Sequence, residues 1–338
     1  MDKLLTISIA AYNVEKYIEQ ALDSILVNPG ISDDLKSRIE VIVINDGSTD
    51  YTAMYAMQYE KQYPGIVKVI NKENGGHGST INTGIQEASG NYFKILDGDD
   101  WFDEVALAYV IQHLENAEAD MVITDYMRCY ENGKRVLECI ENRDIAEKRK
   151  YYFDEIIDEI SWIAFHSAIF KTSVLKDNQI KVDENCFYVD TELMIYMIPH
   201  IQTLEYLNCS LYCYRLGVDG QSVSREGRKK NISDEKKVAD SLLSKYQETT
   251  EILSLPKRKY MIRGIAGHCV WHYRTLLLLK PKKKIKSQIM NFDGKIKNIS
   301  YEIYNCMEHK SKLVSLMRKS HYKFYLPLCL YRQHKREK

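Results

Sequence analysis

The sequence predicts an α/β fold, with a mainly parallel sheet and helices on both of its faces, followed by a helical, basic C-terminal region. Two observations predict the sheet: apolar runs alternate with helical patterns over the first hundred residues, and a polar turn follows each run. A third observation predicts the helical region. From about residue 233 long helical patterns dominate, and basic residues outnumber acidic ones.

Four short apolar runs are interpreted as strands of the sheet. They lie at residues 4–10, 39–45, 65–71 and 91–96. Helical spacing of apolar residues separates these runs, first at 14–26, then after Ser48 and Thr49, and then at 79–89. We expect Ser48 or Thr49 to cap the second of these helices, because a hydroxyl oxygen accepts a free backbone N–H at a helix start.

Beyond residue 103 the pattern is mixed. A helix is expected at about 103–117 and a strand at 120–127, and the turn at 131–135 indicates a hairpin. An amphipathic helix is expected at 234–253, and Pro256 should separate it from a further long helix.

Composition is that of an ordinary globular protein. The 338 residues are 45% hydrophobic and 28% charged, and no uncharged apolar run reaches the roughly 18 residues of a membrane span. The eight cysteines include no C-x-x-C pair, which argues against a zinc site or a disulfide framework. The start lacks the pattern of a signal peptide, so we expect a cytoplasmic protein.

Charge is distributed unevenly, although the net charge is zero. Residues 256–338 hold 21 Lys and Arg against 4 Asp and Glu, whereas residues 1–255 hold 26 against 43. An acidic body can hold metal ions, and a basic region attracts phosphates. Aromatic and leucine residues interleave the basic ones, which suits peripheral binding to an anionic membrane. A solvated helical cap is the alternative, and no nucleic-acid-binding motif accompanies the charge.

Aromatic and hydrogen-bonding side chains follow the first two predicted strands. Tyr12, Asn13 and Glu15 follow the first strand, and Asp46 follows the second. Carboxyl ends of parallel strands meet at one edge of a sheet, where ligands bind. An aromatic ring can stack there on a base, and a carboxylate can accept a base N–H. Each piece taken alone would be a turn or a helix cap.

A glycine-rich segment at 71–79 follows the third strand, and carboxylates at Asp97, Asp99 and Asp100 follow the fourth. Oxygen ligands of this kind suit Mg2+ or Mn2+, and such an ion would bridge a diphosphate. The glycine-rich segment is not a G-x-G-x-x-G phosphate loop and by itself predicts only a mobile segment. His77 within it is interpreted as a surface or packing histidine.

These segments together resemble the family 2 inverting glycosyltransferases, which have the Rossmann-like GT-A fold. The matching runs are "ISIAAYNVEKYIEQALDSIL", "IEVIVINDGSTD", "NKENGGHGSTINTGIQEASGNYFKILDGDDWFD" and, later, "FYVDTEL". The resemblance implies transfer of a sugar from a nucleoside-diphosphate sugar, typically UDP-linked, to a glycan or lipid-linked acceptor. It also implies a Mn2+ or Mg2+ cofactor and a role in bacterial polysaccharide synthesis.

The resemblance implies a set of residues that bind the nucleotide sugar. They are Ala11, Tyr12, Asn13, Glu15, Asp46, Asn82, Asp97 and Gly98. Asp46 matches the aspartate that contacts uracil, and Asn82 matches the asparagine that closes the glycine loop. Asp99 is the implied metal ligand, with Asp97 or Asp100 nearby.

The resemblance implies that Asp190 is the general base, because "FYVDTEL" matches the acidic pair of the family near the acceptor site. Glu192 is the rival base, and a helix cap is the plain alternative for Asp190. Arg215 lies in a segment similar to a loop that follows the base in relatives, where it could face the diphosphate or the acceptor.

The resemblance and the change to basic helical patterns together give the expected domain boundaries. Residues 1–225 would form the GT-A domain, with a nucleotide-sugar half at 1–125 and an acceptor half at 126–225. Residues 226–338 would form the helical basic region. Absence of a Gln-x-x-Arg-Trp motif favours single additions over polymerisation.

Two departures and three alternatives bear on this interpretation. Ala10 stands where the family usually has proline, and Ile81 stands where an arginine commonly precedes the asparagine. A catalytically silent sugar-nucleotide- or membrane-binding scaffold stays open, although the intact D-x-D argues against it. A sugar-nucleotidyltransferase would carry a Gly-rich loop with Arg and Lys after the first strand, which is absent. A dinucleotide-dependent oxidoreductase is not supported, because no G-x-G-x-x-G motif follows any predicted strand.

Overall fold

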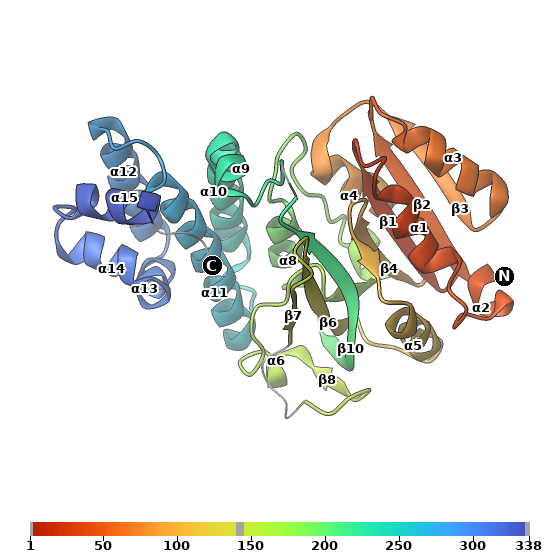
Figure 1. The fold of residues 1–338 in the computed structure, drawn as a ribbon. Helices are drawn as coiled ribbons and strands as arrows, with labels where there is room; N and C mark the ends of the chain where they lie inside the picture. The colour runs from red at the N-terminus through yellow and green to blue at the C-terminus, as the bar shows by residue number, and fades with distance from the viewer. Residues whose placement is uncertain (1–2, 140–144, 219, 335–338) are drawn as a thin grey trace. The chain divides into compact units, whose positions relative to one another are not determined.

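The computed structural model describes residues 3–139, 145–218 and 220–334 (Figure 1). The chain divides into two compact units, residues 1–218 and residues 219–338. The first unit is a mixed α/β structure and the second is helical, which confirms the predicted fold class.

One sheet runs through the first unit in the order β3-β2-β1-β4-β9-β6-β10-β5. Its parallel part consists of β1 (Leu5–Ala11), β2 (Ile39–Asp46), β3 (Val67–Lys72) and β4 (Tyr92–Asp97). These are the four predicted strands. Consecutive residues of β1 and β2 are buried, as expected of parallel strands with helices on both faces.

Helices cover both faces of the parallel strands, as predicted. On one face α1 (Ile18–Leu26) contacts α3 (Thr52–Gln62), while α4 (Gly76–Glu87) packs against β1 and β2 (Figure 1). The chain reverses its direction across the sheet between β3 and β4, so a right-handed crossover places α4 on the opposite face. The short α2 (Asp33–Ser37) precedes β2.

The predicted cap of α3 is wrong. The helix begins at Thr52, and its N-terminal cap makes no side-chain hydrogen bond. The Ser48 hydroxyl instead accepts the N–H of Asn13 at 3.0 Å, and the Thr49 hydroxyl lies 3.4 Å from the Asn13 side-chain oxygen. Asp50 accepts the N–H of Thr52 at 3.0 Å. Both hydroxyls therefore link the loop after β1 to the loop after β2. The carboxylate of Asp50, rather than a hydroxyl, accepts the N–H at the start of α3.

The rest of the sheet is mostly antiparallel. Its strands are β5 (Trp101–Phe102), β6 (Met121–Tyr130), β7 (Arg135–Glu138), β8 (Lys150–Tyr152), β9 (Ala168–Lys171) and β10 (Thr203–Leu216). The predicted hairpin is the β6–β7 pair, with Gly133 in its turn at a φ of 82°. β9 lies between β4 and β6, antiparallel to both, and so carries residues 165–167 toward the carboxyl end of β4.

Short helices connect these strands. They are α5 (Glu104–Leu114), α6 (Phe153–Ile156), α7 (Thr172–Asp177) and α8 (Asp190–Met197). The carboxylate of Asp103 caps α5 by accepting the N–H of Ala106 at 2.9 Å.

The second unit is built from amphipathic helices. They are α9 (Arg225–Lys230), α10 (Ile232–Thr249), α11 (Leu255–Leu276), α12 (Lys283–Ile299), α13 (Tyr301–Lys310), α14 (Lys312–Lys319) and α15 (Tyr325–His334). Pro256 stands in the first turn of α11, where its missing N–H costs nothing, and it separates α10 from α11 as predicted. Among the described helices none is long and apolar enough to cross a bilayer.

A buried ion pair joins α12 to α14. Arg318 Nη2 lies 2.5 Å from Asp293 Oδ1, and the Tyr322 hydroxyl donates to the other carboxylate oxygen at 2.7 Å. Asp293 is 2% exposed and Arg318 is 7% exposed. Glu308 lies farther from the guanidinium group, at 3.7 Å, so Asp293 is the main counterion of buried Arg318.

We predict that Asp293→Ala lowers the free energy of unfolding of the second unit by about 3 kcal/mol, because it leaves buried Arg318 with only the more distant Glu308, at 3.7 Å, as a counterion. Urea denaturation followed by circular dichroism measures the change. Glu302→Ala is the control, because it removes an exposed partner of Arg258 and should cost less than about 1 kcal/mol. Equal losses in the two variants would contradict the assignment.

Candidate active site

The acidic turn, defined as Asp97 to Asp100, begins at the last residue of β4. The backbone N–H of Asp97 donates to the Tyr212 hydroxyl at 3.1 Å, and this hydroxyl donates to Asp100 at 2.7 Å. The N–H of Gly98 donates to the carbonyl of Ala10 at 2.8 Å. A Cβ on Gly98 would lie 2.9 Å from the same oxygen, so a side chain does not fit. Strands β1 and β10 therefore fix the turn.

The carboxylates of the acidic turn ionise differently. Burial, followed by the charge of Asp97, raises the pKa of Asp99 to about 6. Burial and the charges of both neighbours raise the pKa of Asp100 well above its usual range. Burial also opposes ionisation of Asp97, but the charge and hydrogen bond of His77 outweigh it and lower the pKa. A cation at the turn would relieve the repulsion that these shifts reflect.

His77 lies beside the acidic turn, and its ring also packs edge-on against Phe165, so its interpretation as a packing histidine stays open. Its Nε2 lies 3.1 Å from Asp97 Oδ1, and the side chain is 24% exposed. Burial lowers the pKa of His77, but the charge and hydrogen bond of Asp97 reverse this effect and raise it. In the sequence, His77 lies in the glycine-rich segment that follows a predicted strand. This position could have predicted that His77 lies near the other strand ends.

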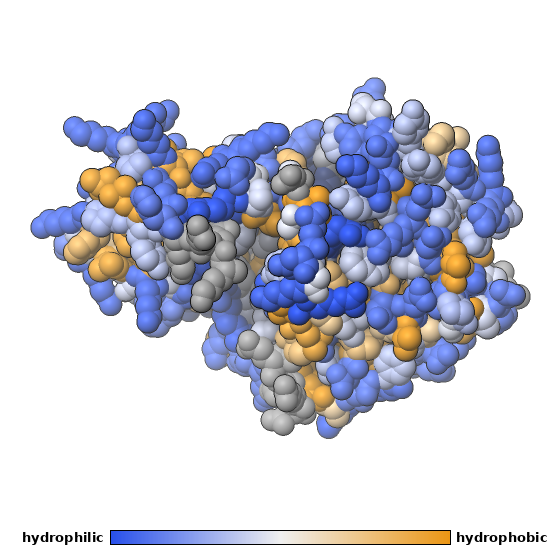
Figure 2. All heavy atoms as spheres, in the orientation of Figure 1, coloured by the Kyte–Doolittle hydropathy of each residue, from blue (hydrophilic) through white to orange (hydrophobic). Residues whose placement is uncertain are grey.

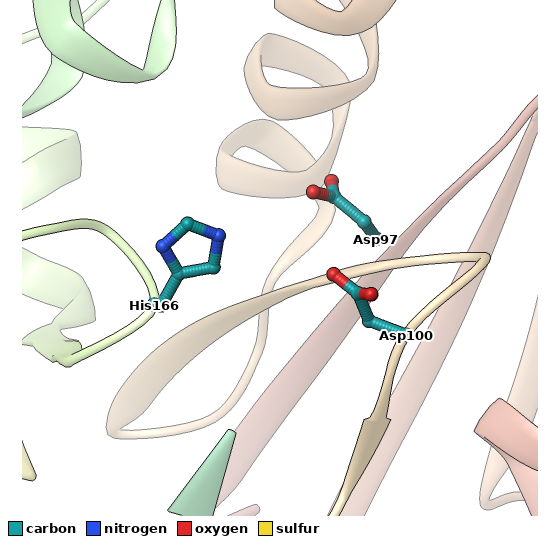
Figure 3. A group of neighbouring side chains, drawn as sticks. All are labelled: Asp97, Asp100 and His166. Atoms are coloured by element: carbon teal, nitrogen blue, oxygen red, sulfur yellow. The ribbon is translucent and has the colours of Figure 1, made fainter. Parts of the chain in front are cut away.

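His166 is a site residue that sequence reasoning missed, because no motif marks it. Figure 3 shows its ring facing Asp97 and Asp100, and one ligand atom from each of the three residues lies within 4.8 Å of the others. Neither ring nitrogen has a hydrogen-bond partner among the described residues. Burial lowers its pKa to about 3, so the ring is neutral.

This group of side chains fits a divalent metal ion. Carboxylate oxygens suit Mg2+ and Mn2+, and a neutral imidazole nitrogen is accepted by transition metals. The raised pKa values of Asp99 and Asp100 show that negative charge is in excess there. Asp99, the predicted ligand, lies in the same turn but outside the group that Asp97, Asp100 and His166 form.

A buried lysine holds the segment that carries His166. Lys94 on β4 is 1% exposed, and its ammonium group donates to the carbonyl oxygens of Phe165, His166 and Ala168. Burial lowers the pKa of Lys94 to about 7, against the charge of Asp97, which raises it. The segment before β9 is thereby held beside the acidic turn.

Arg215 binds the acidic turn from β10. Its backbone N–H donates to the Asp100 carboxylate at 2.7 Å, and its Nε donates to the carbonyl of Asp99 at 2.7 Å. The guanidinium carbon lies 4.6 Å from the ring centroids of both Tyr17 and Trp101. These contacts direct Arg215 to the turn itself; a contact with a diphosphate or an acceptor stays a prediction.

The residues after β1 hold two loops together. The side-chain oxygen of Asn13 accepts the N–H of Thr49 at 2.8 Å, and the Glu15 carboxylate accepts the N–H of Tyr51 at 2.9 Å. Asn13 has a φ of 51°, a left-handed conformation that asparagine tolerates. Tyr12 is 52% exposed, so its ring is available for stacking. Nucleotide contacts by these residues, and by Ala11 at the end of β1, stay predictions.

Asp46 orders the start of α4. Its buried carboxylate accepts the Lys72 ammonium at 2.7 Å, the Ser79 hydroxyl at 3.1 Å and the N–H groups of Gly75 and Gly76 at 2.9 and 2.8 Å. A carboxylate is favoured at the positive end of a helix. The glycine-rich segment is therefore bound to Asp46 and continues into α4, contrary to the expectation of a mobile segment. The predicted contact of Asp46 with uracil remains a prediction.

Residues 182–184 pack directly on α4. The amide of Asn82 accepts the N–H of Val182 and donates to its carbonyl, each at 3.0 Å. A Cβ on Gly78 would overlap the carbonyl oxygen of Asp183. Asn82 thus binds this segment, and its expected role in closing the glycine loop at the nucleotide sugar stays a prediction. Gly78 is required because the two backbones touch.

Asp190 begins α8, just after this segment. Its carboxyl group is half-buried; burial raises its pKa, and the charges of His77 and Asp97 act on it in opposite directions. Asp190 therefore lies within electrostatic reach of the acidic turn. Glu192 is fully buried and accepts the N–H of Asp183 at 2.8 Å, so it supports the segment.

Comparisons with known proteins agree with this geometry. The family described as Glycosyl transferase family 2 matches residues 6–178, about half of the chain. Glycosyltransferase GlyA of Streptococcus pneumoniae is 27% identical over 228 residues, which are 64% of this chain and 31% of that protein. The minor teichoic acid biosynthesis protein GgaB of Bacillus subtilis is 28% identical over 223 residues, 64% of this chain and 23% of that protein.

Among solved structures, residues 1–349 of S. aureus TarS in complex with UDP-GlcNAc match with a TM-score of 0.69. The match covers 99% of this chain and 93% of that one, at 20% identity, and so shows a shared fold. The chain belongs to glycosyl transferase family 2, a family of glycosyltransferases, and has the GT-A fold with a helical C-terminal region. It spans less than a third of the length of GlyA and of GgaB.

We predict that Gly78→Ala displaces residues 182–186, because its methyl group overlaps the Asp183 carbonyl. Hydrogen–deuterium exchange should rise at least about fivefold in peptides that span 180–190, in line with a local loss of about 1 kcal/mol or more. Gly267→Ala in α11 is the matched control, since its Cβ meets no atom within 4 Å. Unchanged exchange at 180–190 in Gly78→Ala would refute the prediction.

Proposed function

We propose that this protein is an inverting glycosyltransferase that moves a sugar from a UDP sugar to a hydroxyl group of a glycan or lipid-linked acceptor. The observation that carries the proposal is the convergence of the acidic turn, His77 and Asp190 at the carboxyl end of β4. Ligands bind at the carboxyl ends of the strands in sheets of this kind. TarS, which shares the fold, was solved with UDP-GlcNAc, and GgaB is a teichoic acid biosynthesis protein.

The donor site would lie between the ends of β1, β2 and β4. The exposed ring of Tyr12 would stack on the base, and Asp46 would accept a base N–H. The hydrogen bonds of Asn13 and Glu15 to the loop after β2 keep these two strand ends at a fixed separation. Residues of the donor site are thereby organised before the nucleotide arrives, which lowers the entropy cost of binding.

Asp99, with Asp97 or Asp100 nearby, would hold the Mn2+ or Mg2+ ion. When bound, the ion supplies Lewis-acid stabilisation of the departing nucleoside diphosphate. Tyr212 and Arg215 keep the turn in one conformation through their hydrogen bonds to Asp100. The raised pKa of Asp99 means that protons and metal ions compete for this carboxyl group, so metal affinity should fall in acid.

Asp190 would remove the proton of the acceptor hydroxyl as that oxygen attacks the anomeric carbon. Attack from the face opposite the leaving diphosphate inverts the anomeric centre. Asn82 and Glu192 act through the backbone of residues 182 and 183 and position the segment that leads to Asp190. The raised pKa of Asp190 makes it a stronger base than an ordinary carboxylate.

The reaction would add one sugar at a time and would take place at a membrane surface. The absence of the Gln-x-x-Arg-Trp motif supports addition of one sugar at a time. The basic character of residues 256–338 supports peripheral binding to the cytoplasmic face of an anionic membrane, where lipid-linked acceptors occur. The silent-scaffold alternative predicts that UDP sugars bind without turnover, and slow donor hydrolysis would exclude it.

We predict that UDP affinity depends on metal. Isothermal titration with Mn2+ should show binding that weakens at least tenfold after chelation, because the acidic turn then repels the diphosphate. Asp99→Ala should weaken binding to a similar extent and remove the effect of chelation. Asp33→Ala, which removes an exposed carboxylate in α2, should behave as wild type. Metal-independent UDP binding by the wild type would exclude the proposed metal site.

We predict that Asp190→Asn lowers the turnover of UDP-GlcNAc, as transfer or slow hydrolysis, by about a hundredfold or more. UDP and Mn2+ affinities should stay within twofold, because the amide keeps the shape of the side chain. Glu192→Gln is the matched control: its amide oxygen still accepts the N–H of Asp183, so turnover should fall only a few-fold. If Glu192→Gln abolishes turnover and Asp190→Asn does not, Glu192 is the base.

The same assignment gives a pH dependence. A general base works in its deprotonated form, and burial raises the pKa of Asp190 above its usual range. The wild-type rate should therefore fall as the pH drops through this raised pKa. The Asp190→Asn variant should lose this acidic limb of its pH–rate profile.

A further inference from the structure

The second unit contains an apolar cavity that the proposed sugar transfer does not use. It has a volume of about 760 Å³ and lies among α10, α11 and α12. Its apolar walls are formed by Leu276 at the end of α11, Leu279 in the loop that follows, and Ile285 and Phe292 in α12. Cavities of about 300–1,000 Å³ hold small organic ligands in proteins. The size and walls of the cavity therefore suit a hydrocarbon chain.

Four lysines surround the apolar walls. Lys236 and Lys295 share the single carboxylate of Asp240, at 2.6 and 2.8 Å. Lys282 and Lys284 also line the cavity, are exposed, and have no ion-pair partner among the described residues. The rim thus carries four ammonium groups against one carboxylate. An anionic group at the rim would be attracted to Lys282 and Lys284 in particular.

The apolar walls and the lysines around them together favour one chemical class of ligand. Apolar surface predominates in the lining, although Ser233, His272, Gln288 and Asn291 also line the cavity. A free sugar or nucleotide would therefore leave most of the wall without an apolar partner, and a neutral hydrocarbon would make no use of the four lysines. A molecule with a hydrocarbon chain and a phosphate satisfies both parts at once, because water leaves the apolar walls and the phosphate meets ammonium groups. Hydrophobic patches also lie between hydrophilic side chains over α12–α15, at the left of the view (Figure 2).

We propose that this cavity binds one molecule of an anionic phospholipid, with part of its hydrocarbon chain between α11 and α12 and its phosphate at Lys282 and Lys284. The site differs from general attraction of a basic surface to a membrane, because it requires a chain-sized cavity and two particular lysines. All of its residues belong to the second unit. The proposal is therefore independent of the residues that would bind UDP.

The first experiment uses dodecyl phosphate below its critical micelle concentration as the probe. Isothermal titration should show one molecule bound per chain. Leu279→Trp, a half-exposed position at the mouth, should weaken binding at least tenfold by filling the cavity. Lys282→Glu with Lys284→Glu should also weaken it at least tenfold. Dodecyl maltoside, which has the same chain and no charge, should bind at least tenfold more weakly than dodecyl phosphate.

The matched control for charge is Lys312→Glu with Lys319→Glu, which makes the same change of net charge at exposed positions of α14. It should leave dodecyl phosphate affinity within twofold of wild type. Equal weakening by the two charge-reversal pairs would overturn the proposal in favour of a diffuse basic surface. Binding without saturation at one molecule per chain, or equal binding of dodecyl maltoside, would overturn it as well.

The second experiment uses vesicles of 70% phosphatidylcholine and 30% phosphatidylglycerol. Wild-type protein should sediment with these vesicles and not with pure phosphatidylcholine, and Leu279→Trp should reduce the bound fraction at least fivefold. Binding of dodecyl phosphate without binding of the vesicles would identify a soluble amphiphile as the occupant and refute the phospholipid. UDP affinity should be unchanged in Leu279→Trp. The phospholipid site and the proposed sugar transfer are therefore tested by different measurements.

Discussion

Repulsion among the carboxylates of the acidic turn is the constraint on which the rest of the site depends. Asp97, Asp99 and Asp100 follow one another so closely that burial and mutual repulsion raise two of their pKa values. The fold offsets this cost with donors from other elements: Tyr212 and Arg215 from β10 bind Asp100, and His77 lies against Asp97. The excess negative charge that remains at Asp99 is what suits the turn to a divalent cation.

The contact between α4 and residues 182–184 links the proposed donor side of the site to the segment that leads to Asp190. Asp46 binds the start of α4 from the donor side, and Asn82 in the same helix binds the backbone that leads to Asp190. Helix α4 thus contacts both the proposed donor site and the segment that leads to the proposed base. The glycine at position 78 lets the two backbones touch, and this explains a glycine-rich segment that lacks the spacing of a phosphate loop.

Local sequence patterns predicted the parallel strands and their polar ends, because each strand is a short apolar run that closes with turn residues. They did not predict His166, because β9 brings it to the acidic turn by pairing with β4 across a long stretch of chain. They also misassigned Ser48 and did not place His77 beside Asp97, since the partners of these side chains lie on other loops. The apolar wall of the second-unit cavity looks, in sequence, like any amphipathic helix.

The most direct test of the account is a crystal structure of the protein with UDP and Mn2+, with manganese located by anomalous scattering. The account predicts a manganese peak within about 2.0–2.5 Å of a carboxylate oxygen of the acidic turn, with the diphosphate as a further ligand and uracil near Tyr12 and Asp46. UDP bound elsewhere, or bound at these strand ends with no manganese at the turn, would contradict the central claim.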